Sequence, residues 1–263
     1  MGASDRDRPP DHPRTPKSCH RSAKPGGMDL NDKVVIITGA SSGIGEATAR
    51  RCAQAGAHLV LAARRTDRIE ALATELRDAT AVPTDLRRPD EVRALVTAAV
   101  ATFGGVDVLV NNAGQGLHVP VAEIDPADFV AVTELNVYAP LLAMQAVIPM
   151  MRARGGGSIV NVSSGTTLMV PVGMGGYAAT KAALNMLSRA ARVELAPDNI
   201  AVSVVYPFIT ATAFHDSLRA GRSPLQRGAL PPHPPELVAE AILALIDSGD
   251  EEAVLLPDGL RSS

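Results

Sequence analysis

Two side chains on one predicted helix can carry out proton transfer: the phenol of Tyr177 and the ammonium of Lys181. They are four residues apart, so on a helix they share one face and the ammonium can lie near the phenol. A free phenol has a pKa near ~10, and a neighbouring cation favours the phenolate. We therefore expect the pKa of Tyr177 to move toward neutral pH, where an acid/base catalyst works best.

A glycine-rich loop connects the first predicted strand to the first predicted helix over residues 38–45. Its three glycines permit positive φ, a close approach of the backbone to a pyrophosphate and close packing of helix on strand. The N-terminus of the helix offers unpaired N–H groups and the positive end of the helix dipole. Strand, loop and helix in this order predict a dinucleotide site, although a purely structural turn is an alternative. The expected contacts are Gly39, Ser41, Ser42, Gly43, Ile44 and Gly45.

The residues after the second predicted strand indicate which nicotinamide cofactor is used. In NAD sites an acidic residue ~20 positions past the glycines binds the 2′-hydroxyl of the ribose. This chain has Ala63, Arg64 and Arg65 at that point. Two guanidinium groups can bind the 2′-phosphate of NADP by charge-assisted hydrogen bonds, and no carboxylate repels it. The sequence favours NADP(H) over NAD(H); the alternative is a solvated basic start of a helix.

The elements that would position these residues follow an alternating pattern. From Lys33 onward, short apolar runs rich in β-branched residues alternate with longer stretches of helical periodicity, which is typical of βαβ units. Strands are predicted over residues 34–38, 58–62, 81–83, 106–110, 158–162, 201–205 and 253–256. Helices are predicted over residues 43–55, 66–77, 89–103, 128–154, 176–195 and 235–248. Because parallel crossovers are right-handed, we predict an α/β fold with a single Rossmann-type doubly wound parallel sheet of about seven strands and helices on both faces.

Three further segments lie toward the carboxyl ends of predicted strands, where such sheets bind ligands. Residues 111–114 (Asn-Asn-Ala-Gly) follow the fourth strand, Ser164 follows the fifth, and residues 177–181 open the next helix. A Tyr-x-x-x-Lys pair alone is not specific. With the glycine loop, and with Ser164 thirteen residues before Tyr177, the order and spacing make residues 30–257 resemble the short-chain dehydrogenase/reductase family.

The resemblance implies a role for each matching residue. Tyr177 would donate and accept the proton, Lys181 would also hold the nicotinamide ribose, and Ser164 would polarise the substrate carbonyl. Asn136 would help to maintain a water chain that relays the proton to solvent, and Asp85 would accept a hydrogen bond from the adenine amine. Further cofactor contacts are implied for Leu86, Asn111, Ala113, Gly114, Pro207, Thr210 and Thr212. Asn111 could instead cap a strand.

One position departs from the family pattern. After the sixth strand the family commonly has Pro-Gly and then a hydroxyl residue that contacts the nicotinamide carboxamide. This chain has Pro207 followed by Phe208, with Thr212 at the hydroxyl position. A bulky ring therefore replaces a glycine, whose backbone is free to adopt more conformations. This change puts the shape of the loop and the space for substrate in question, but not the cofactor contacts.

The substrate pocket is expected between residues 115–119, 166–176 and 213–228. Its apolar residues favour a ketone or secondary alcohol with a hydrophobic body. They are Leu168, Met169, Val170, Val172, Met174 and Phe214. His118 and His215 are candidate substrate contacts, although histidines on the surface are commoner. No group of His, Cys and carboxylates has the spacing of metal ligands, so no metal site is predicted.

These features together predict an NADP(H)-dependent oxidoreductase that transfers hydride between the nicotinamide and a carbonyl or secondary alcohol of a largely apolar small molecule, with Tyr177 as general acid/base. One alternative is a 3-oxoacyl carrier-protein-type reductase, for which Arg219, Arg222 and Arg227 are candidate contacts. Another is a non-catalytic NADP(H)-sensing module. A homodimer or homotetramer is expected, because the helices that the sequence predicts over residues 137–154 and 177–195 resemble the family's four-helix interface.

Composition argues against several classes of protein. With 46% hydrophobic residues, 20% charged residues and a net charge of −3, nucleic acid is not expected as a partner. The longest uncharged stretch, residues 137–151, is shorter than the about 20 apolar residues that span a membrane, so a buried helix is expected there. Cys19 and Cys52 cannot supply a disulfide framework, and the first residues lack the apolar segment of a signal peptide, so a cytoplasmic location is predicted.

The N-terminal segment differs from the rest of the chain. Residues 1–27 contain five prolines and no periodic apolar pattern, so they cannot bury enough surface to offset the entropy lost on ordering. We expect a disordered tail over residues 1–27 and a single dinucleotide-binding catalytic domain over residues 28–263. Met28 stands just before the first predicted strand. One hypothesis is that translation starts at Met28, and the other is that residues 1–27 are an extension without effect.

Overall fold

The structure, a computed structural model, describes residues 27–169, 171–212, 214, 217–222 and 232–257. Several predicted features lie outside the described residues: most of the N-terminal tail, the pocket residue Val170, the candidate substrate contact His215, and Arg227. The helices are α1 (Gly43–Gln54), α2 (Thr66–Leu76), α3 (Pro89–Phe103), α4 (Pro126–Thr133), α5 (Ala139–Ala153), α6 (Gly175–Leu195) and α7 (Pro235–Ser248). The main strands are β1 (Val34–Thr38), β2 (His58–Ala63), β3 (Ala79–Pro83), β4 (Val108–Asn111), β6 (Gly157–Val162), β7 (Ile200–Pro207) and β9 (Glu252–Leu255).

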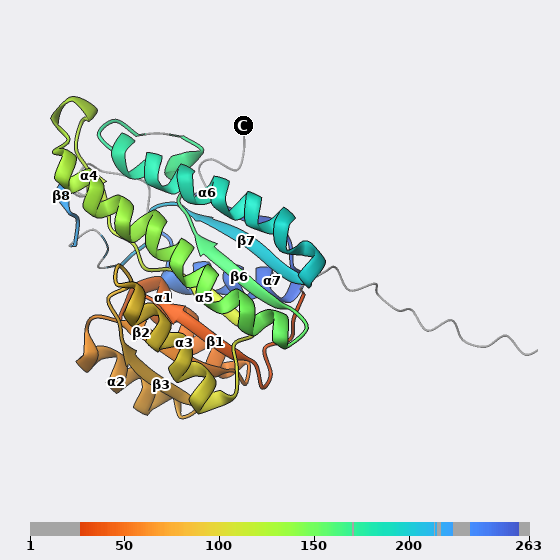
Figure 1. The fold of residues 1–263 in the computed structure, drawn as a ribbon. Coiled ribbons are helices and arrows are strands. Elements are labelled where there is room, and N and C mark those ends of the chain that lie inside the picture. The colour runs from red at the N-terminus through yellow and green to blue at the C-terminus, as the bar shows by residue number, and fades with distance from the viewer. Residues whose placement is uncertain (1–26, 170, 213, 215–216, 223–231, 258–263) are drawn as a thin grey trace, which may run out of the picture.

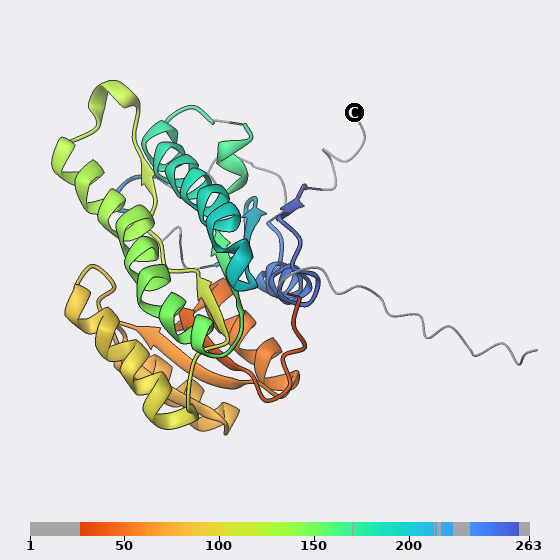
Figure 2. The same ribbon diagram turned by 45° about the vertical axis from the view of Figure 1, so that its right-hand side comes forward.

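Seven parallel strands form one sheet in the order β3-β2-β1-β4-β6-β7-β9. The chain winds outward from β1 in one direction through β3 and then in the other direction from β4. Helices α1, α2 and α7 pack on one face of the sheet, and α3, α5 and α6 cover the other (Figures 1 and 2). The predicted doubly wound α/β fold is confirmed. Its change of winding direction between β1 and β4 opens a crevice at the carboxyl ends of the strands.

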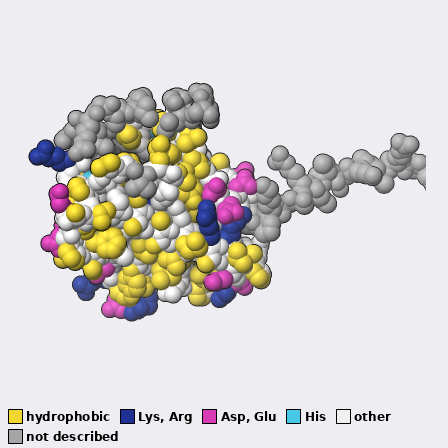
Figure 3. Space-filling view, turned by 90° about the horizontal axis from the view of Figure 1, so that it is seen from above, with side chains coloured by type: hydrophobic (Ala, Val, Ile, Leu, Met, Phe, Trp, Pro, Cys, Tyr) yellow, Lys and Arg dark blue, Asp and Glu magenta, His cyan; other side chains and the backbone are white. Residues whose placement is uncertain are grey.

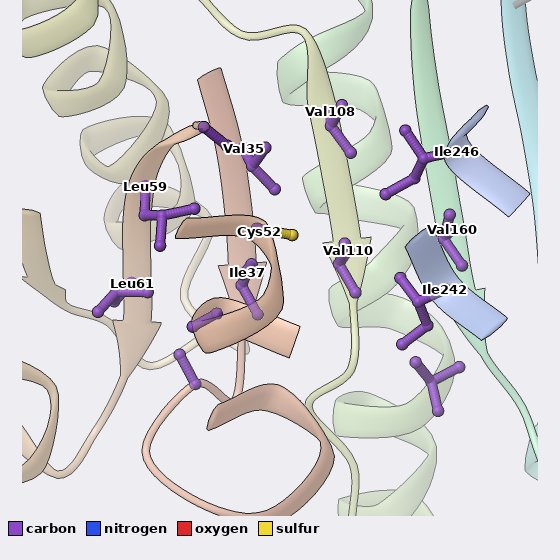
Figure 4. Close-up of a cluster of buried hydrophobic side chains, with 14 of the residues drawn as sticks. Val35, Ile37, Cys52, Leu59, Leu61, Val108, Val110, Val160, Ile242 and Ile246 are labelled. Carbon is purple, nitrogen blue, oxygen red and sulfur yellow. The ribbon is translucent and has the colours of Figure 1, made fainter. Parts of the chain in front are cut away.

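Each central strand is buried on both sides, which explains its continuous apolar sequence. In β1, Val35 and Ile37 join the core beneath α1 and α7, whereas Val34 and Ile36 join the core beneath α3 and α5. Figure 4 shows the first of these cores. Its labelled side chains are Val35, Ile37, Cys52, Leu59, Leu61, Val108, Val110, Val160, Ile242 and Ile246. Two tightly packed layers therefore hold the carboxyl ends of the strands in fixed positions.

The helix predicted over residues 128–154 is interrupted. A π-helical turn at Glu134–Tyr138 separates α4 from α5, and the N–H of Ala139 donates to the carbonyl of Glu134, five residues back. Pro140 has no N–H, so the regular helical bond to the carbonyl of Asn136 cannot form. Single π-helical turns inside α-helices often mark functional sites. This one contains Asn136, whose side chain is directed inward and buried.

The same helical stretch, Pro126–Ala153, is long and apolar enough to cross a membrane by length and composition alone. Core helices of soluble proteins meet the same criterion. Its inner face packs on the sheet through Ala143, Val147 and Met151, in agreement with the buried helix expected at residues 137–151. However, only 39% of its most apolar window is buried, so its other face lies at the surface.

Candidate active site

A cavity of about 1040 Å³ lies at the carboxyl ends of the central strands. The glycine loop, the ends of β2 and β4, the segment after β6 and the loop after β7 all contribute to its walls. Of the predicted site residues, all but Gly45, Asn111 and Asn136 line it. Site residues that are spread over more than 170 positions of the sequence therefore line one cavity.

The glycine loop has the conformation that its composition predicts. Gly39 has a φ of +66°, and a Cβ atom there would lie 2.9 Å from the Cα of Ala113. Gly45 lies behind the loop, where a Cβ atom would come within 2.4 Å of the carbonyl oxygen of Gly39. A side chain at Gly39 would push away the segment after β4, and one at Gly45 would push α1 away from the loop, so that neither would leave the loop in the shape a pyrophosphate needs. The residues present therefore fit a dinucleotide.

Arg65 is fixed at the mouth of this loop. Its Nη2 donates to the hydroxyl of Ser41 at 2.9 Å and to that of Ser42 at 2.6 Å. Arg64 is exposed beside it and lines the same cavity. Both arginines directly follow β2, and the two serine hydroxyls orient the guanidinium of Arg65.

Arg87 is a cavity residue that the sequence analysis missed. It donates to the carboxylate of Asp85, with Nη2 2.6 Å from Oδ2. This hydrogen bond lowers the pKa of Asp85 to about 2, against the opposing effect of burial. The carboxylate expected to accept from adenine thus already has a partner. The only signal for Arg87 was a basic residue two positions after Asp85 at a strand end.

Three of the four predicted catalytic side chains, Ser164, Tyr177 and Lys181, meet at the floor of the cavity. Tyr177 and Lys181 share the inner face of α6, and both are buried. Ser164 lies close enough to the phenol of Tyr177 to lower its pKa. The Nζ of Lys181 donates to the carbonyl of Val162 at 2.8 Å. The side chain of Thr166 donates to the Ser164 oxygen at 3.0 Å, which leaves the Ser164 proton free to point toward another acceptor.

The expected fall in the pKa of Tyr177 is wrong. Burial raises the pKa of Tyr177 to about 12, and the hydrogen bond from Ser164 offsets only part of that rise. Burial also lowers the pKa of Lys181 to about 8. Sequence reasoning considered the charge of the neighbour and left out the removal of both groups from water, which favours the neutral form of each. At neutral pH the phenol is therefore protonated and can donate.

This pKa shift predicts a pH-dependent stability. Between about pH 8 and pH 10.5 the unfolded chain retains the Lys181 proton and the folded chain has lost it, so the free energy of unfolding rises with pH. Tyr177 acts in the opposite direction, but only above about pH 10. From pH 8 to pH 10, wild type should gain roughly 2 kcal/mol relative to Lys181→Met in urea unfolding. A difference that does not change with pH would mean that Lys181 is solvated.

Asn136 lies behind the cavity wall and organises the segment that follows β4. Its Oδ1 accepts from the N–H of Gln115 at 2.8 Å, and its Nδ2 donates to the carbonyl of Gln115 at 2.9 Å and to Thr180 Oγ1 at 3.1 Å. It is fully buried. The Asn136 amide thus joins the π-helical turn to α6 and to the segment after Gly114. Its three hydrogen bonds are all made with protein groups.

Removing this amide should destabilise the fold. Asn136→Ala removes three hydrogen bonds, two to the part-buried backbone of Gln115 and one to the buried Thr180 hydroxyl, and we expect the free energy of unfolding to fall by about 2–4 kcal/mol. The matched control is Asn185→Ala, because Asn185 is a buried amide on α6 with a single hydrogen bond, to Thr167 at 3.2 Å. Urea unfolding of the two variants measures the difference. Equal losses of unfolding free energy in the two variants would show that the hydrogen bonds of Asn136 stabilise the fold no more than that of Asn185.

Asn111 does not line the cavity. Its Nδ2 donates to Asn161 Oδ1 at 2.9 Å, and Asn161 donates in turn to Ser188 Oγ at 2.8 Å, all within the core. The neighbouring Asn112 lines the cavity instead, and its Nδ2 donates to the carbonyl of Thr38 at 2.9 Å. A strand alternates its side chains, so only one of two adjacent asparagines can face the ligand, and the sequence did not show which.

The loop after β7 accommodates Phe208 without strain. Among the described residues, only Asp32, Arg77 and Asn199 have positive φ without being glycine, so Phe208 does not occupy a conformation that needs glycine. Its ring lies against the Cα of Gly165. Thr210 donates to the carbonyl of Phe208 at 3.2 Å and is buried. The loop therefore does not need a glycine at position 208 for its backbone conformation. The effect of Phe208 is on the space inside the cavity.

The expected substrate walls are largely present. Met169, Val172, Met174 and Phe214 line the cavity, whereas Leu168 is exposed and does not. The segment after β7 is joined to the segment after β4 by a short parallel pair, β5 (Leu117–His118) with β8 (Ala220–Gly221), which the sequence did not predict.

Two side chains support this pair of short strands. His118 lies edge-on to Tyr177 with ring centroids 6.1 Å apart, and its Nδ1 is 3.3 Å from the carbonyl oxygen of Arg222. Arg219 forms an ion pair with Asp128 on α4, with 2.6 Å between Nε and Oδ1. The described part of the substrate loop is thus attached to both sides of the cavity mouth.

Comparisons with known proteins agree with this geometry. The family model described as short chain dehydrogenase matches residues 33–223. An uncharacterised oxidoreductase of Staphylococcus aureus (strain USA300) is 33% identical over 216 residues, which cover 81% of this chain and 90% of that protein.

Solved structures give the same result. A 3-ketoacyl-(acyl-carrier-protein) reductase from Brucella melitensis, complexed with NADH, has a TM-score of 0.80 at 32% identity and covers 89% of this chain and 100% of its own. An alcohol dehydrogenase from Thermococcus sibiricus, complexed with 5-hydroxy-NADP, has a TM-score of 0.77 at 31% identity and covers 88% of this chain and 99% of its own. The chain belongs to the short-chain dehydrogenase family of oxidoreductases.

Proposed function

We propose that the protein is an NADP(H)-dependent reductase of ketones with a largely apolar body. The observation that carries the proposal is the meeting of Ser164, Tyr177 and Lys181 at the floor of a cavity whose other end is a dinucleotide loop. A nicotinamide bound there supplies or accepts the hydride. The chain's own residues bind the substrate, exclude water and move the proton.

The proton donor is the phenol of Tyr177. Burial keeps it protonated at neutral pH, which suits the reduction of a carbonyl because an alkoxide oxygen must receive a proton. Ser164 lies beside the same phenol, so a carbonyl oxygen placed between them would accept from both hydroxyls. Lys181 lies on the same face of α6, where its amine can bind ribose hydroxyls.

The preference for NADP rests on the arginines after β2. Arg65 is held by two serine hydroxyls, Arg64 is exposed beside it, and the acidic residue typical of NAD sites is replaced by Ala63. Two of the solved relatives show that related chains differ in this respect, since the Brucella reductase was complexed with NADH and the Thermococcus enzyme with an NADP derivative. The local charge of this chain favours the second case.

The proposed function is tested by an assay of NAD(P)H oxidation at 340 nm. A panel of ketones of rising apolar size is assayed with NADPH and NADH separately. We expect turnover with several ketones and a kcat/KM for NADPH at least tenfold above that for NADH. Tight NADPH binding without any turnover would instead support a non-catalytic cofactor-sensing module.

A carrier-linked 3-oxo ester is a second candidate substrate, because the Brucella relative is a 3-ketoacyl-(acyl-carrier-protein) reductase. Of the candidate basic contacts, Arg222 is exposed at the cavity wall, whereas Arg219 is paired with Asp128. Within the described part of the chain, one available candidate arginine is a weak landing site for an acidic carrier protein. If this candidate is correct, an acetoacetyl-carrier substrate should be reduced faster than the free ketones, and Arg222→Glu should remove that advantage.

We also propose that the protein is a homo-oligomer. Apolar side chains stand exposed on the outer faces of α4, α6 and the turn before α5: Phe129, Val130, Tyr138, Met186 and Val193. Helix α6 lies along the upper side of the molecule in Figure 1, and the view from above shows hydrophobic side chains over much of that face, with charged groups mostly toward its edges (Figure 3). Such a face is typical of an interface. Sedimentation should give a dimer or tetramer.

A further inference from the structure

Aromatic side chains are rare in this chain but concentrated in the cavity. The sequence has no Trp, four Phe and three Tyr. Three of these seven side chains, Tyr177, Phe208 and Phe214, line the cavity. In a core built from aliphatic residues, rings gathered at one place are better explained by what the cavity holds than by general packing.

Phe208 occupies the space next to Ser164. A Cβ atom on Gly165, the residue that follows Ser164, would lie 2.5–2.6 Å from the Cδ2, Cε2 and Cζ atoms of the Phe208 ring. The ring therefore rests directly on the backbone of Gly165. A substituent that extends toward Gly165 from a carbonyl group held by the Ser164 hydroxyl would therefore meet this ring.

Phe214 lies beside Tyr177, away from Gly165 in the sequence and in its recorded contacts. Its ring lies 5.7 Å from the ring of Tyr177, at an interplanar angle of 55°. Met169, Val172 and Met174 line the cavity as well and add flexible or branched apolar surface. Offset and tilted ring pairs at such distances are favourable, so a further flat ring can pack here. An aryl substituent next to Tyr177 would therefore have the Phe214 ring to pack against.

From this asymmetry we propose that the substrate is an aryl ketone whose second substituent is about the size of a methyl group. Phe208 limits the small substituent, and Phe214 contacts the aryl ring. This proposal rests on the proposed function, and it names Phe208 as the residue that sets substrate size. Phe208 acts through excluded volume, so a smaller residue should widen the range of ketones rather than abolish reduction.

The test compares phenyl ketones that differ only in the second substituent: methyl (acetophenone), ethyl (propiophenone) and propyl (butyrophenone). With NADPH, wild-type kcat/KM should fall at least tenfold from acetophenone to butyrophenone. In Phe208→Ala the ratio of butyrophenone to acetophenone should rise at least tenfold. The control is Phe129→Ala, because Phe129 is a partly exposed ring on α4 outside the cavity, and its ratio should stay within threefold of wild type.

The aryl side is tested separately through Phe214→Ala. The ratio of kcat/KM for acetophenone to that for 2-butanone should fall at least fivefold in this variant, because only acetophenone has a ring to pack. Calorimetry of NADPH binding verifies that each variant is folded. If Phe208→Ala does not bind NADPH, Phe208→Leu keeps the apolar contact with Gly165 and should raise the butyrophenone ratio at least threefold.

The possible outcomes distinguish failure of the aryl ketone proposal from failure of the proposed ketone reductase activity. If no ketone is reduced with NADPH or NADH, the proposed function fails. If wild type reduces acetophenone and butyrophenone equally well, or if the ratio in the Phe208 variants stays within threefold of wild type, the enzyme is a ketone reductase and the role given to Phe208 is wrong.

Discussion

Replacing Tyr177 with Phe is expected to lower kcat for ketone reduction by about 10²–10⁴-fold, the usual contribution of a positioned general acid. The substitution removes one oxygen from a ring that is 6% exposed, so the packing of the ring against Phe214 remains. The loss should appear in kcat and in kcat/KM together, because the proton is transferred only in the transition state. Stopped-flow measurement of NADPH oxidation gives both values.

Cofactor binding provides the internal check on this result. The Kd for NADPH in Tyr177→Phe should stay within about fivefold of wild type, because the phosphate and ribose contacts come from other residues. Tyr138→Phe is the matched control, since Tyr138 is an exposed tyrosine on the surface before α5 and should keep wild-type kcat. Turnover retained in Tyr177→Phe would show that another group donates the proton.

Replacing Arg64 and Arg65 together with Ala is expected to weaken NADPH binding about 100-fold and NADH binding by less than about fivefold. Hydrogen bonds to a charged group each contribute about 1.5–3 kcal/mol, and tenfold in affinity corresponds to about 1.4 kcal/mol. NADH lacks the 2′-phosphate, so it loses only the support that Arg65 gives to Ser41 and Ser42. Calorimetric titration with each cofactor measures both changes.

Arg68→Ala is the control for this pair. Arg68 is an exposed arginine on α2, the helix that begins directly after Arg65, but it does not line the cavity. Its removal changes the net charge without touching the proposed phosphate site, so both affinities should stay within about twofold. Equal losses of NADPH and NADH in the double variant would mean that the arginines support the loop and do not select the cofactor.

The fold could be predicted from the sequence because the periodicity of apolar residues indicates the order of strands and helices. Strands such as β1 and β4 are buried on both faces and therefore appear as unbroken apolar runs, and the parallel order follows from the helices between them. The break between α4 and α5 was not accessible. Pro140 signals a disturbance, but tolerated prolines near helix starts look the same in sequence, and the π-helical turn depends on the contacts of Asn136.

The candidate site was predictable to the extent that motifs are local. Tyr177 and Lys181 are four residues apart, so any helix places them together. Their pKa values were not predictable, because the degree of burial depends on the sheet and loops that surround α6. The packing of Phe208 on Gly165 joins residues from separate strand ends, and only the assembled fold brings them into contact. Arg87 pairs with Asp85 two positions away, but its place in the cavity wall depends on the other strand ends around it.

The position of the substrate oxygen in a crystal structure of the enzyme with NADP⁺ and acetophenone tests the central claim most directly. The account predicts that this oxygen lies within about 2.6–3.2 Å of both the Tyr177 and the Ser164 hydroxyl oxygens, with the methyl group toward Phe208. An acetophenone oxygen beyond hydrogen-bonding distance of Tyr177, with the ketone otherwise well ordered in the cavity, would contradict it.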